Sequence, residues 1–223
     1  RLRSEAELSI SRAIEERGVA RIGIEFFQAL LRLRQCALIP ALIDDRFRQI
    51  ESAKMEMLEE MIDEILSGGH KVLVFSQFVE ALKTIADRLS ARRYRYAYLD
   101  GQTKDRAGAI QSFREDPAVK IFLLSLKAGG VGINLTEADY VILFDPWWNP
   151  AVESQAVDRA HRMGQTEKVT VYRLLAKDTV EERIEELKQK KRALVADLIT
   201  PEAQFYKSLT REDIMRLLGS AND

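Results

Sequence analysis

The chain of 223 residues contains one cysteine, five prolines and almost no net charge. The single Cys36 excludes an internal disulfide and favours a reducing compartment, and its apolar neighbours predict a packing role rather than a reactive thiol. Because 34 basic residues nearly balance 35 acidic ones, the bulk charge of −1 gives no indication of nucleic-acid binding. A surface that binds DNA would therefore have to be a local patch.

Long apolar runs and a secretory signal are also missing. No stretch approaches the roughly 20 apolar residues of a membrane span, so we expect a soluble, intracellular protein without a membrane partner. The first residue is Arg1 rather than Met, which suggests a piece of a longer protein. The hydrophobic content of 46% is sufficient for the core of one large domain, or of a compact domain with an appendage.

Hydrophobic periodicity changes near residue 70. Residues 1–50 have a helical pattern that is broken at Gly18 and near Pro40, and a further helix is expected to end at Gly68. Short apolar runs then predict strands over 71–76, 94–99, 120–125, 140–144 and 169–175. Helices are predicted over 79–91, up to Phe113, and over 152–162, 179–196 and 210–218.

This alternation predicts an α/β fold with a mostly parallel sheet and helices on both faces. We expect a helical protrusion at 1–50, the α/β domain at 51–200 and a helical tail at 201–223. The helix over 179–196 is expected to pack across the sheet through Ile184, Leu187 and Leu194. In such sheets the loops at the carboxyl ends of the strands form the functional surface.

Two arginines in the segment 155–165 are the strongest indication of function. Arg159 and Arg162 are three residues apart on a predicted helix, so both guanidinium groups project from one face. Fixed guanidinium groups can bind phosphate oxygens bidentately. The alternative is that Asp158 pairs with Arg162 on a solvated helix face.

Two loops after predicted strands have unusual compositions. Gly129, Gly130 and Gly132 could bring backbone amides close to a phosphate, or could form a turn that allows tight packing of a helix on the sheet. The segment lacks the third glycine of a dinucleotide fingerprint, and no Gly-Lys-Ser/Thr of a P-loop follows it. Trp147 and Trp148 could stack on bases, although packing of one or both against the following helix is the preferred interpretation.

Five motifs follow one another along the chain: Lys71-Val-Leu-Val-Phe-Ser-Gln-Phe78, Leu99-Asp-Gly-Gln-Thr103, Ser125-Leu-Lys-Ala-Gly-Gly-Val-Gly-Ile-Asn-Leu135, Asp145-Pro-Trp-Trp-Asn-Pro150 and the segment 155–165. Their order and intervals resemble the second RecA-like motor domain of superfamily 2 helicase-like ATPases, and within it the Swi/Snf branch of DNA translocases. The resemblance covers about residues 28–185. A bacterial or archaeal member is expected from a weak likeness of the C-terminal tail.

The resemblance implies roles for individual residues. Arg159 and Arg162 would be arginine fingers, and Gln155 would orient their helix at the nucleotide. Gly130 and Gly132 would contact ATP and couple its site to the DNA track. The residues expected at the DNA backbone are Ser76, Gln77, Gly101, Gln102, Thr103, Ser125 and Lys127. Lys127 could equally be a solvated lysine.

No sequence here matches the P-loop, and no Asp-Glu-x-His follows a predicted strand. We therefore expect ATP and Mg²⁺ to be bound mainly by an N-terminal RecA-like lobe, with no metal site in this chain, and we expect the chain alone to be inactive. Double-stranded DNA would be the second partner. The location would be cytoplasmic in a bacterium or archaeon and nuclear in a eukaryote.

One departure and two alternatives remain open. The stretch from Thr103 to Phe113 is about two residues shorter than the family pattern, and Gly108 inside its helix costs about 1 kcal/mol relative to Ala. The alternatives are a nucleic-acid-binding module without a motor role and an RNA helicase lobe of the same superfamily. The arginine pair argues against the first, and the Asp145–Pro150 loop favours the DNA branch over the second.

Overall fold

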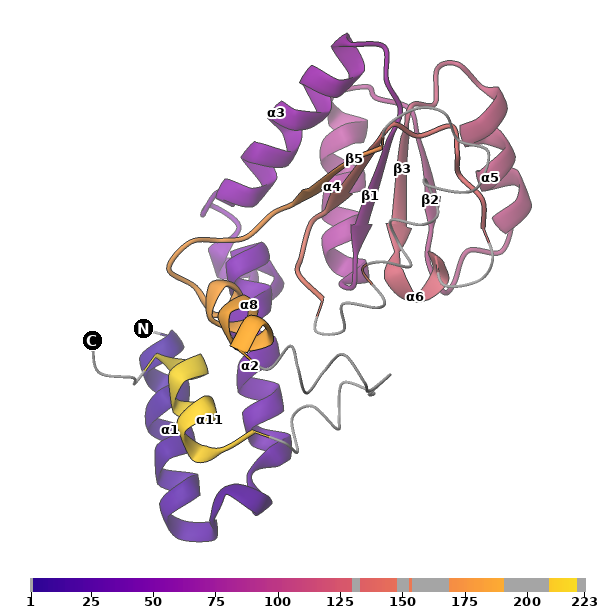
Figure 1. Cartoon of the computed structure of the whole chain (residues 1–223). Helices are drawn as coiled ribbons and strands as arrows, with labels where there is room; N and C mark the ends of the chain where they lie inside the picture. The colour runs from indigo at the N-terminus through magenta and orange to yellow at the C-terminus, as the bar shows by residue number, and fades with distance from the viewer. Residues whose placement is uncertain (1, 130–132, 148–152, 154–168, 191–208, 220–223) are drawn as a thin grey trace. The chain divides into compact units, whose positions relative to one another are not determined.

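A computed structural model describes residues 2–129, 133–147, 153, 169–190 and 209–219 (Figure 1). The chain folds into two compact units. The first unit, called the helical unit below, contains residues 1–52 and 176–223, and the second, the sheet unit, contains residues 53–175. None of the described helices is long and apolar enough to cross a bilayer.

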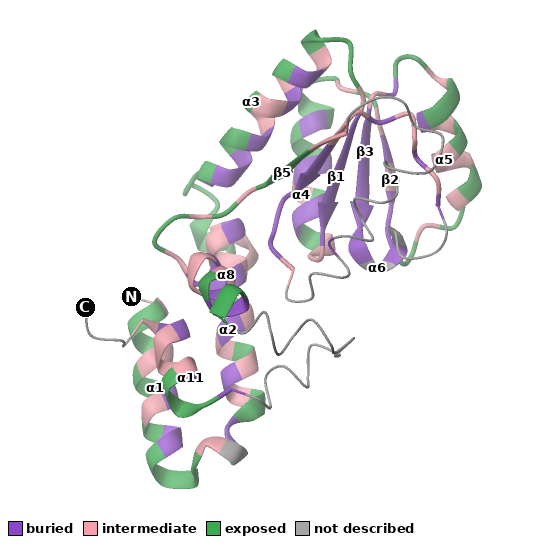
Figure 2. Ribbon diagram, viewed as in Figure 1, coloured by how far each residue is buried: buried purple, intermediate pink, exposed green. Residues whose placement is uncertain are grey.

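The described residues of the sheet unit form five strands that all run parallel, as the sequence predicts. They are β1 (Val72–Ser76), β2 (Tyr96–Leu99), β3 (Ile121–Ser125), β4 (Tyr140–Leu143) and β5 (Thr170–Arg173). Their order is β2-β3-β1-β4-β5, and each adjacent pair is parallel. Figure 2 shows the central strands buried along their length, whereas β5 at one edge is largely exposed. Continuous apolar runs therefore form the inner strands.

Helices cover both faces of this sheet. Leu73 and Phe75 of β1 join a core cluster with Phe113 of α5 (Arg106–Glu115). The alternate residues of β1 point to the opposite face, where α4 (Val79–Ala91) contacts β1 and β3. The unit also contains α3 (Ala53–Ser67), which ends just before Gly68 as predicted, and α6 (Leu126–Gly129). The expected RecA-like arrangement, α/β with helices on both faces, is confirmed.

Gly108 lies in the first turn of α5, close to the residue that caps the helix. Asp105 caps α5 by accepting a hydrogen bond from the Gly108 amide at 2.8 Å. A Cβ at position 108 would meet the Asp105 carboxylate, so this flexible side chain would have to shift. The cap therefore offsets part of the intrinsic cost of a helical glycine without requiring glycine at this position.

The helical unit contains α1 (Leu2–Arg17), α2 (Gly23–Leu38), α8 (Val180–Lys190) and α11 (Arg211–Leu218), with short 3₁₀ turns at Val19–Arg21, Pro40–Leu42 and Asp45–Phe47. The interruption at Gly18 agrees with its positive φ of 76°. The expected packing of the helix near 179–196 on the sheet is wrong for its described part. Ile184 and Leu187 are buried where α8 packs against α2 and α11.

Two parts of the predicted organisation fall outside the described residues. They are most of the helix expected over 152–162 and the domain boundary expected at 200/201. The residues from Ala176 onward belong to the same compact unit as the N-terminal helices, a division that differs from the expected 51–200 domain.

Candidate functional site

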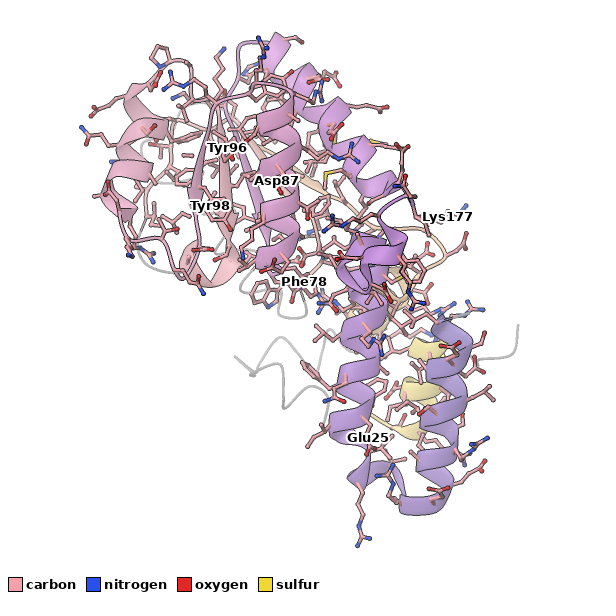
Figure 3. The ribbon with its side chains drawn as sticks, turned by 180° about the vertical axis from the view of Figure 1, so that it is seen from behind. Glu25, Phe78, Asp87, Tyr96, Tyr98 and Lys177 are labelled. Carbon is pink, nitrogen blue, oxygen red and sulfur yellow. The ribbon has the colours of Figure 1, made fainter. Side chains whose placement is uncertain are left out.

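Four strands of the sheet unit end at the same edge, the one formed by the carboxyl ends of the strands. The loops that follow these strands carry the described part of the candidate site. The register aligns Ser76 with Ser125 and places Leu99 beside Leu124. Phe75 is likewise aligned with Leu143. Figure 3 shows Phe78, which precedes α4, and Tyr98 of β2 toward this end of the unit. The structure thus brings together loops that are separated in the sequence, as the parallel topology requires.

A buried carboxylate organises the loop after β1. Asp145, which is 1% exposed, accepts hydrogen bonds from the Ser76 hydroxyl and from the amide of Gln77, the latter at 3.2 Å. The side-chain amide of Gln77 also donates to Asp145 and, at 3.2 Å, to the carbonyl of Pro146. Several donors compensate the carboxylate for the loss of water. The loop after β4 is therefore tied directly to the loop after β1.

Ser76 is completely buried. Its hydroxyl donates to Asp145, and it accepts a hydrogen bond from the amide of Phe78 at 3.0 Å. This arrangement makes Ser76 a residue that shapes the predicted DNA-contact loop from the inside. Gln77 is only partly buried and lies nearer to the surface of the same loop.

A second aspartate shapes the loop after β2. Asp100 accepts hydrogen bonds from the Gln102 amide at 2.8 Å, the Thr103 hydroxyl at 3.2 Å and the Tyr98 hydroxyl at 3.1 Å. Burial raises the pKa of Asp100, but these hydrogen bonds outweigh it and leave the pKa below its usual value. Burial and the charge of Asp100 raise the pKa of Tyr98. Gly101, Gln102 and Thr103 therefore form a turn built around an ionised carboxylate.

The loop after β3 begins with another buried hydroxyl. Ser125 is 3% exposed and accepts a hydrogen bond from the amide of Ala128 at 3.3 Å, which caps the short helix α6. Arg106 of α5 donates to the carbonyl of Ala128 at 2.7 Å. The backbone of Lys127 lies in α6, and its side chain is not among those that the structure describes.

The segment after β4 is held by a second buried carboxylate. Glu153 is 2% exposed and accepts a hydrogen bond from the Trp147 amide at 2.7 Å. Its other oxygen lies 3.1 Å from a guanidinium nitrogen of Arg173, at the end of β5. Trp147 packs against the hydrophobic core of the sheet unit, whereas the expected packing of a tryptophan against the following helix stays a prediction. Trp148 lies outside the described residues.

The predicted nucleotide residues, Gly130, Gly132, Gln155, Arg159 and Arg162, all lie outside the described residues, and their roles stay predictions. The described carboxylates of the segment that follows β4, Asp145 and Glu153, are engaged by donors of the chain itself. Carboxylates engaged in this way do not fit a Mg²⁺ site built from them.

Sequence reasoning assigned no role to Asp100, Asp145 or Glu153. For the two aspartates a signal was present, because each directly follows a predicted apolar strand and so begins a loop at the functional edge. For Glu153 no local signal separates it from the other acidic residues of the chain, since its partner Arg173 is 20 positions away along the sequence.

Comparisons with known proteins agree on one family. Residues 53–164 match the model of the helicase conserved C-terminal domain. The chain is 48% identical over 146 residues to the chromatin-remodeling ATPase INO80 of Aspergillus oryzae, a match that covers 65% of this chain and 10% of that protein. It is 43% identical over 168 residues to an ATP-dependent helicase of Mycoplasma pneumoniae, covering 74% of this chain and 16% of that one.

Solved structures give the same result. The Sulfolobus solfataricus SWI2/SNF2 ATPase core in complex with double-stranded DNA superimposes with a TM-score of 0.78 at 33% identity, covering 97% of this chain and 46% of that one. The C-terminal domain of the same ATPase gives a TM-score of 0.69 at 34% identity, covering 90% and 83%. The matched part of the chain thus spans about a tenth to a sixth of the length of the two curated relatives named above.

Proposed function

Because this chain belongs to the Swi/Snf family and carries its helicase conserved C-terminal domain, we propose that it is the second motor lobe of a DNA-dependent ATPase. The observation that carries the proposal is the edge at which β1, β2, β3 and β4 end, where three loops with predicted DNA contacts lie next to the segment that leads to the arginine pair. A DNA track and a nucleotide site would meet at this edge.

In the nucleotide site the chain would supply cations. Arg159 and Arg162 would neutralise the charge that develops on the γ-phosphoryl group of ATP held by an N-terminal lobe. Gln155 would orient the helix that carries them, and the backbone amides at Gly130 and Gly132 would approach the phosphates. The N-terminal lobe would also hold Mg²⁺, since the described carboxylates at this edge are engaged within the chain.

On the DNA side, the exposed parts of the three loops would contact the sugar-phosphate backbone. Gln77, the turn from Gly101 to Thr103 and Lys127 would make these contacts, while Ser76 and Ser125, whose hydroxyls are buried, would shape the loops and offer at most their backbone. Phosphate contacts position a protein without reading sequence, so binding would be salt-sensitive and sequence-tolerant. The DNA complex of the Sulfolobus relative supports duplex DNA over RNA as the partner.

In this mechanism the lobe would close over the nucleotide and open again after hydrolysis. Asp145 ties the loop after β1 to the loop after β4, so a movement at the nucleotide side would be transmitted to the DNA-contact loop through hydrogen bonds rather than through flexible chain. Repeated cycles would move the lobe along the duplex.

The test is ATP hydrolysis by the full motor, with this chain joined to its proposed N-terminal lobe, in the presence and absence of duplex DNA. Arg162→Ala should lower the rate of DNA-stimulated hydrolysis by roughly 10³-fold or more, which is the contribution of an arginine finger to kcat. Arg95→Ala is the matched control, because Arg95 precedes β2 at the opposite edge and pairs there with Asp116 at 2.9 Å. Normal activity in Arg162→Ala, or no response to DNA, would refute the proposed function.

A further inference from the structure

Glu153 is the described residue closest in sequence to the arginine pair, and it is among the most buried charged residues of the chain. Its backbone is helical. It precedes Gln155 by two positions and Arg159 by six. Glu153 is therefore the described position from which the residues that we propose to act on the nucleotide follow along the sequence.

Two described contacts help to determine where Glu153 lies. One carboxylate oxygen accepts the Trp147 amide at 2.7 Å, which fixes the loop leaving β4. The other faces Arg173 at 3.1 Å, at the last residue of β5. Leu143 at the end of β4 is in register with Arg173, so the carboxylate bridges the ends of two adjacent strands. The two oxygens thus connect the start of the arginine-bearing segment to the sheet in two directions.

The ion pair of Glu153 fixes a position in the fold more than it adds to the free energy of unfolding. Removing a carboxylate from water costs free energy, and an ion pair in such a place often adds little net stability compared with apolar packing. What it does impose is a defined position, because both oxygens must meet their donors at hydrogen-bond distance. The Arg173 side chain remains about half exposed, at 52%, whereas the Glu153 side chain is 3% exposed.

We propose that Glu153 is a positioning residue for the arginine pair, and that its ion pair with Arg173 sets the place from which Arg159 and Arg162 reach the γ-phosphate. This inference rests on the proposed function. Catalysis depends steeply on such placement, since a shift of about 1 Å far from the reacting atoms can cost on the order of 10²-fold in rate. Binding of ATP and of DNA depends mainly on other residues, so a defect in placement lowers kcat and leaves affinity unchanged.

The experiment measures kcat, the KM for ATP and the dissociation constant for duplex DNA in the full motor. Glu153→Gln keeps an acceptor for the Trp147 amide and removes the charge that pairs with Arg173. We expect kcat to fall by about 10- to 100-fold, with KM and DNA affinity within about twofold of the wild type. The matched control is Glu137→Gln, which removes a second Glu–Arg pair of the sheet unit, Arg114 to Glu137 at 3.3 Å, and should leave all three quantities unchanged.

The partner residue provides an independent arm. Arg173→Met should reproduce the loss of kcat, and Arg173→Lys should restore most of it because the cation is kept. The double variant of Glu153→Gln with Arg173→Met should be no worse than either single variant, because both remove one interaction. If Glu153→Gln does not fold, as judged by thermal unfolding, the comparison of Arg173→Met with Arg173→Lys carries the test.

The possible outcomes separate this inference from the proposed function. If Arg162→Ala loses activity while Glu153→Gln and Arg173→Met keep a normal kcat, the positioning role is wrong and the motor function stands. A rise in KM or a weaker affinity for DNA, with normal kcat, would also overturn it. If Arg162→Ala is itself fully active, the proposed function fails and the inference fails with it.

Discussion

The hydrogen bond between Ser76 and Asp145 should contribute measurably to the stability of the sheet unit. Ser76→Ala removes a buried donor to a carboxylate and leaves the Phe78 amide without this acceptor. Hydrogen bonds to charged groups contribute about 1.5–3 kcal/mol, so we expect the free energy of unfolding to fall by that amount. Asp145→Asn preserves the shape of the side chain and keeps one acceptor oxygen, but it removes the charge and places an amide nitrogen where the second oxygen accepts from Gln77, so we expect a loss of similar size.

A double-mutant cycle tests whether these two losses have a common origin. Since Ser76→Ala removes this hydrogen bond and Asp145→Asn removes the charge of its acceptor, the double variant should be more stable than the sum of the two losses predicts, by about 1 kcal/mol. Urea unfolding followed by tryptophan fluorescence reports on the sheet unit, because Trp147 and Trp148 are the only tryptophans of the chain and both belong to residues 53–175.

The control is Ser90→Ala, since the Ser90 hydroxyl contacts the Tyr96 hydroxyl at 3.0 Å in an exposed place. Its effect should stay within about 0.5 kcal/mol. Purely additive losses for Ser76 and Asp145, or a cost for Ser76→Ala no larger than that of Ser90→Ala, would show that the buried carboxylate does not depend on this hydroxyl.

Two further predictions concern single elements. Because its pKa is lowered in the folded state, Asp100 stabilises the sheet unit fully above its unfolded pKa of about 3.9, and this contribution is lost as the pH falls through the folded pKa. The urea midpoints of wild type and Asp100→Asn should therefore differ at about pH 6 and approach each other as the pH falls below about 3.9, and a constant difference would contradict this. The second concerns α11, where the Thr210 side chain accepts a hydrogen bond from the Asp213 amide and the Asp213 side chain accepts one from the Thr210 amide. Thr210→Ala should therefore accelerate amide hydrogen exchange in α11 by a factor corresponding to about 1 kcal/mol. The tryptophan transition of the sheet unit should not change, and unaltered exchange in α11 would refute the role of the cap.

Local patterns were sufficient to predict the elements of the sheet unit. The predicted helix over 79–91 has the observed bounds of α4, and each predicted strand overlaps an observed one. The reason is that a short apolar run bounded by turn residues matches the length and burial of an inner strand of such a sheet, and β1, β3 and β4 are strands of this kind. The order of motifs along the chain was equally sufficient to indicate the family.

The packing partner of a helix could not be predicted in this way. The apolar face of α8, with Ile184 and Leu187, was recognised correctly, but that face packs among helices and not on the sheet. Amphipathic periodicity states which side of a helix is buried, and it contains no information about the surface that buries it.

The sequence by itself determined the strands, the loops at their carboxyl ends and the residue types that those loops present. Only the tertiary structure decided which of these side chains point inward. Ser76 and Asp145 are 69 positions apart, and Glu153 and Arg173 are 20 apart, yet each pair meets in the folded chain. Such contacts depend on the order and register of the strands, because a buried carboxylate takes its donors from whichever segments the sheet places beside it.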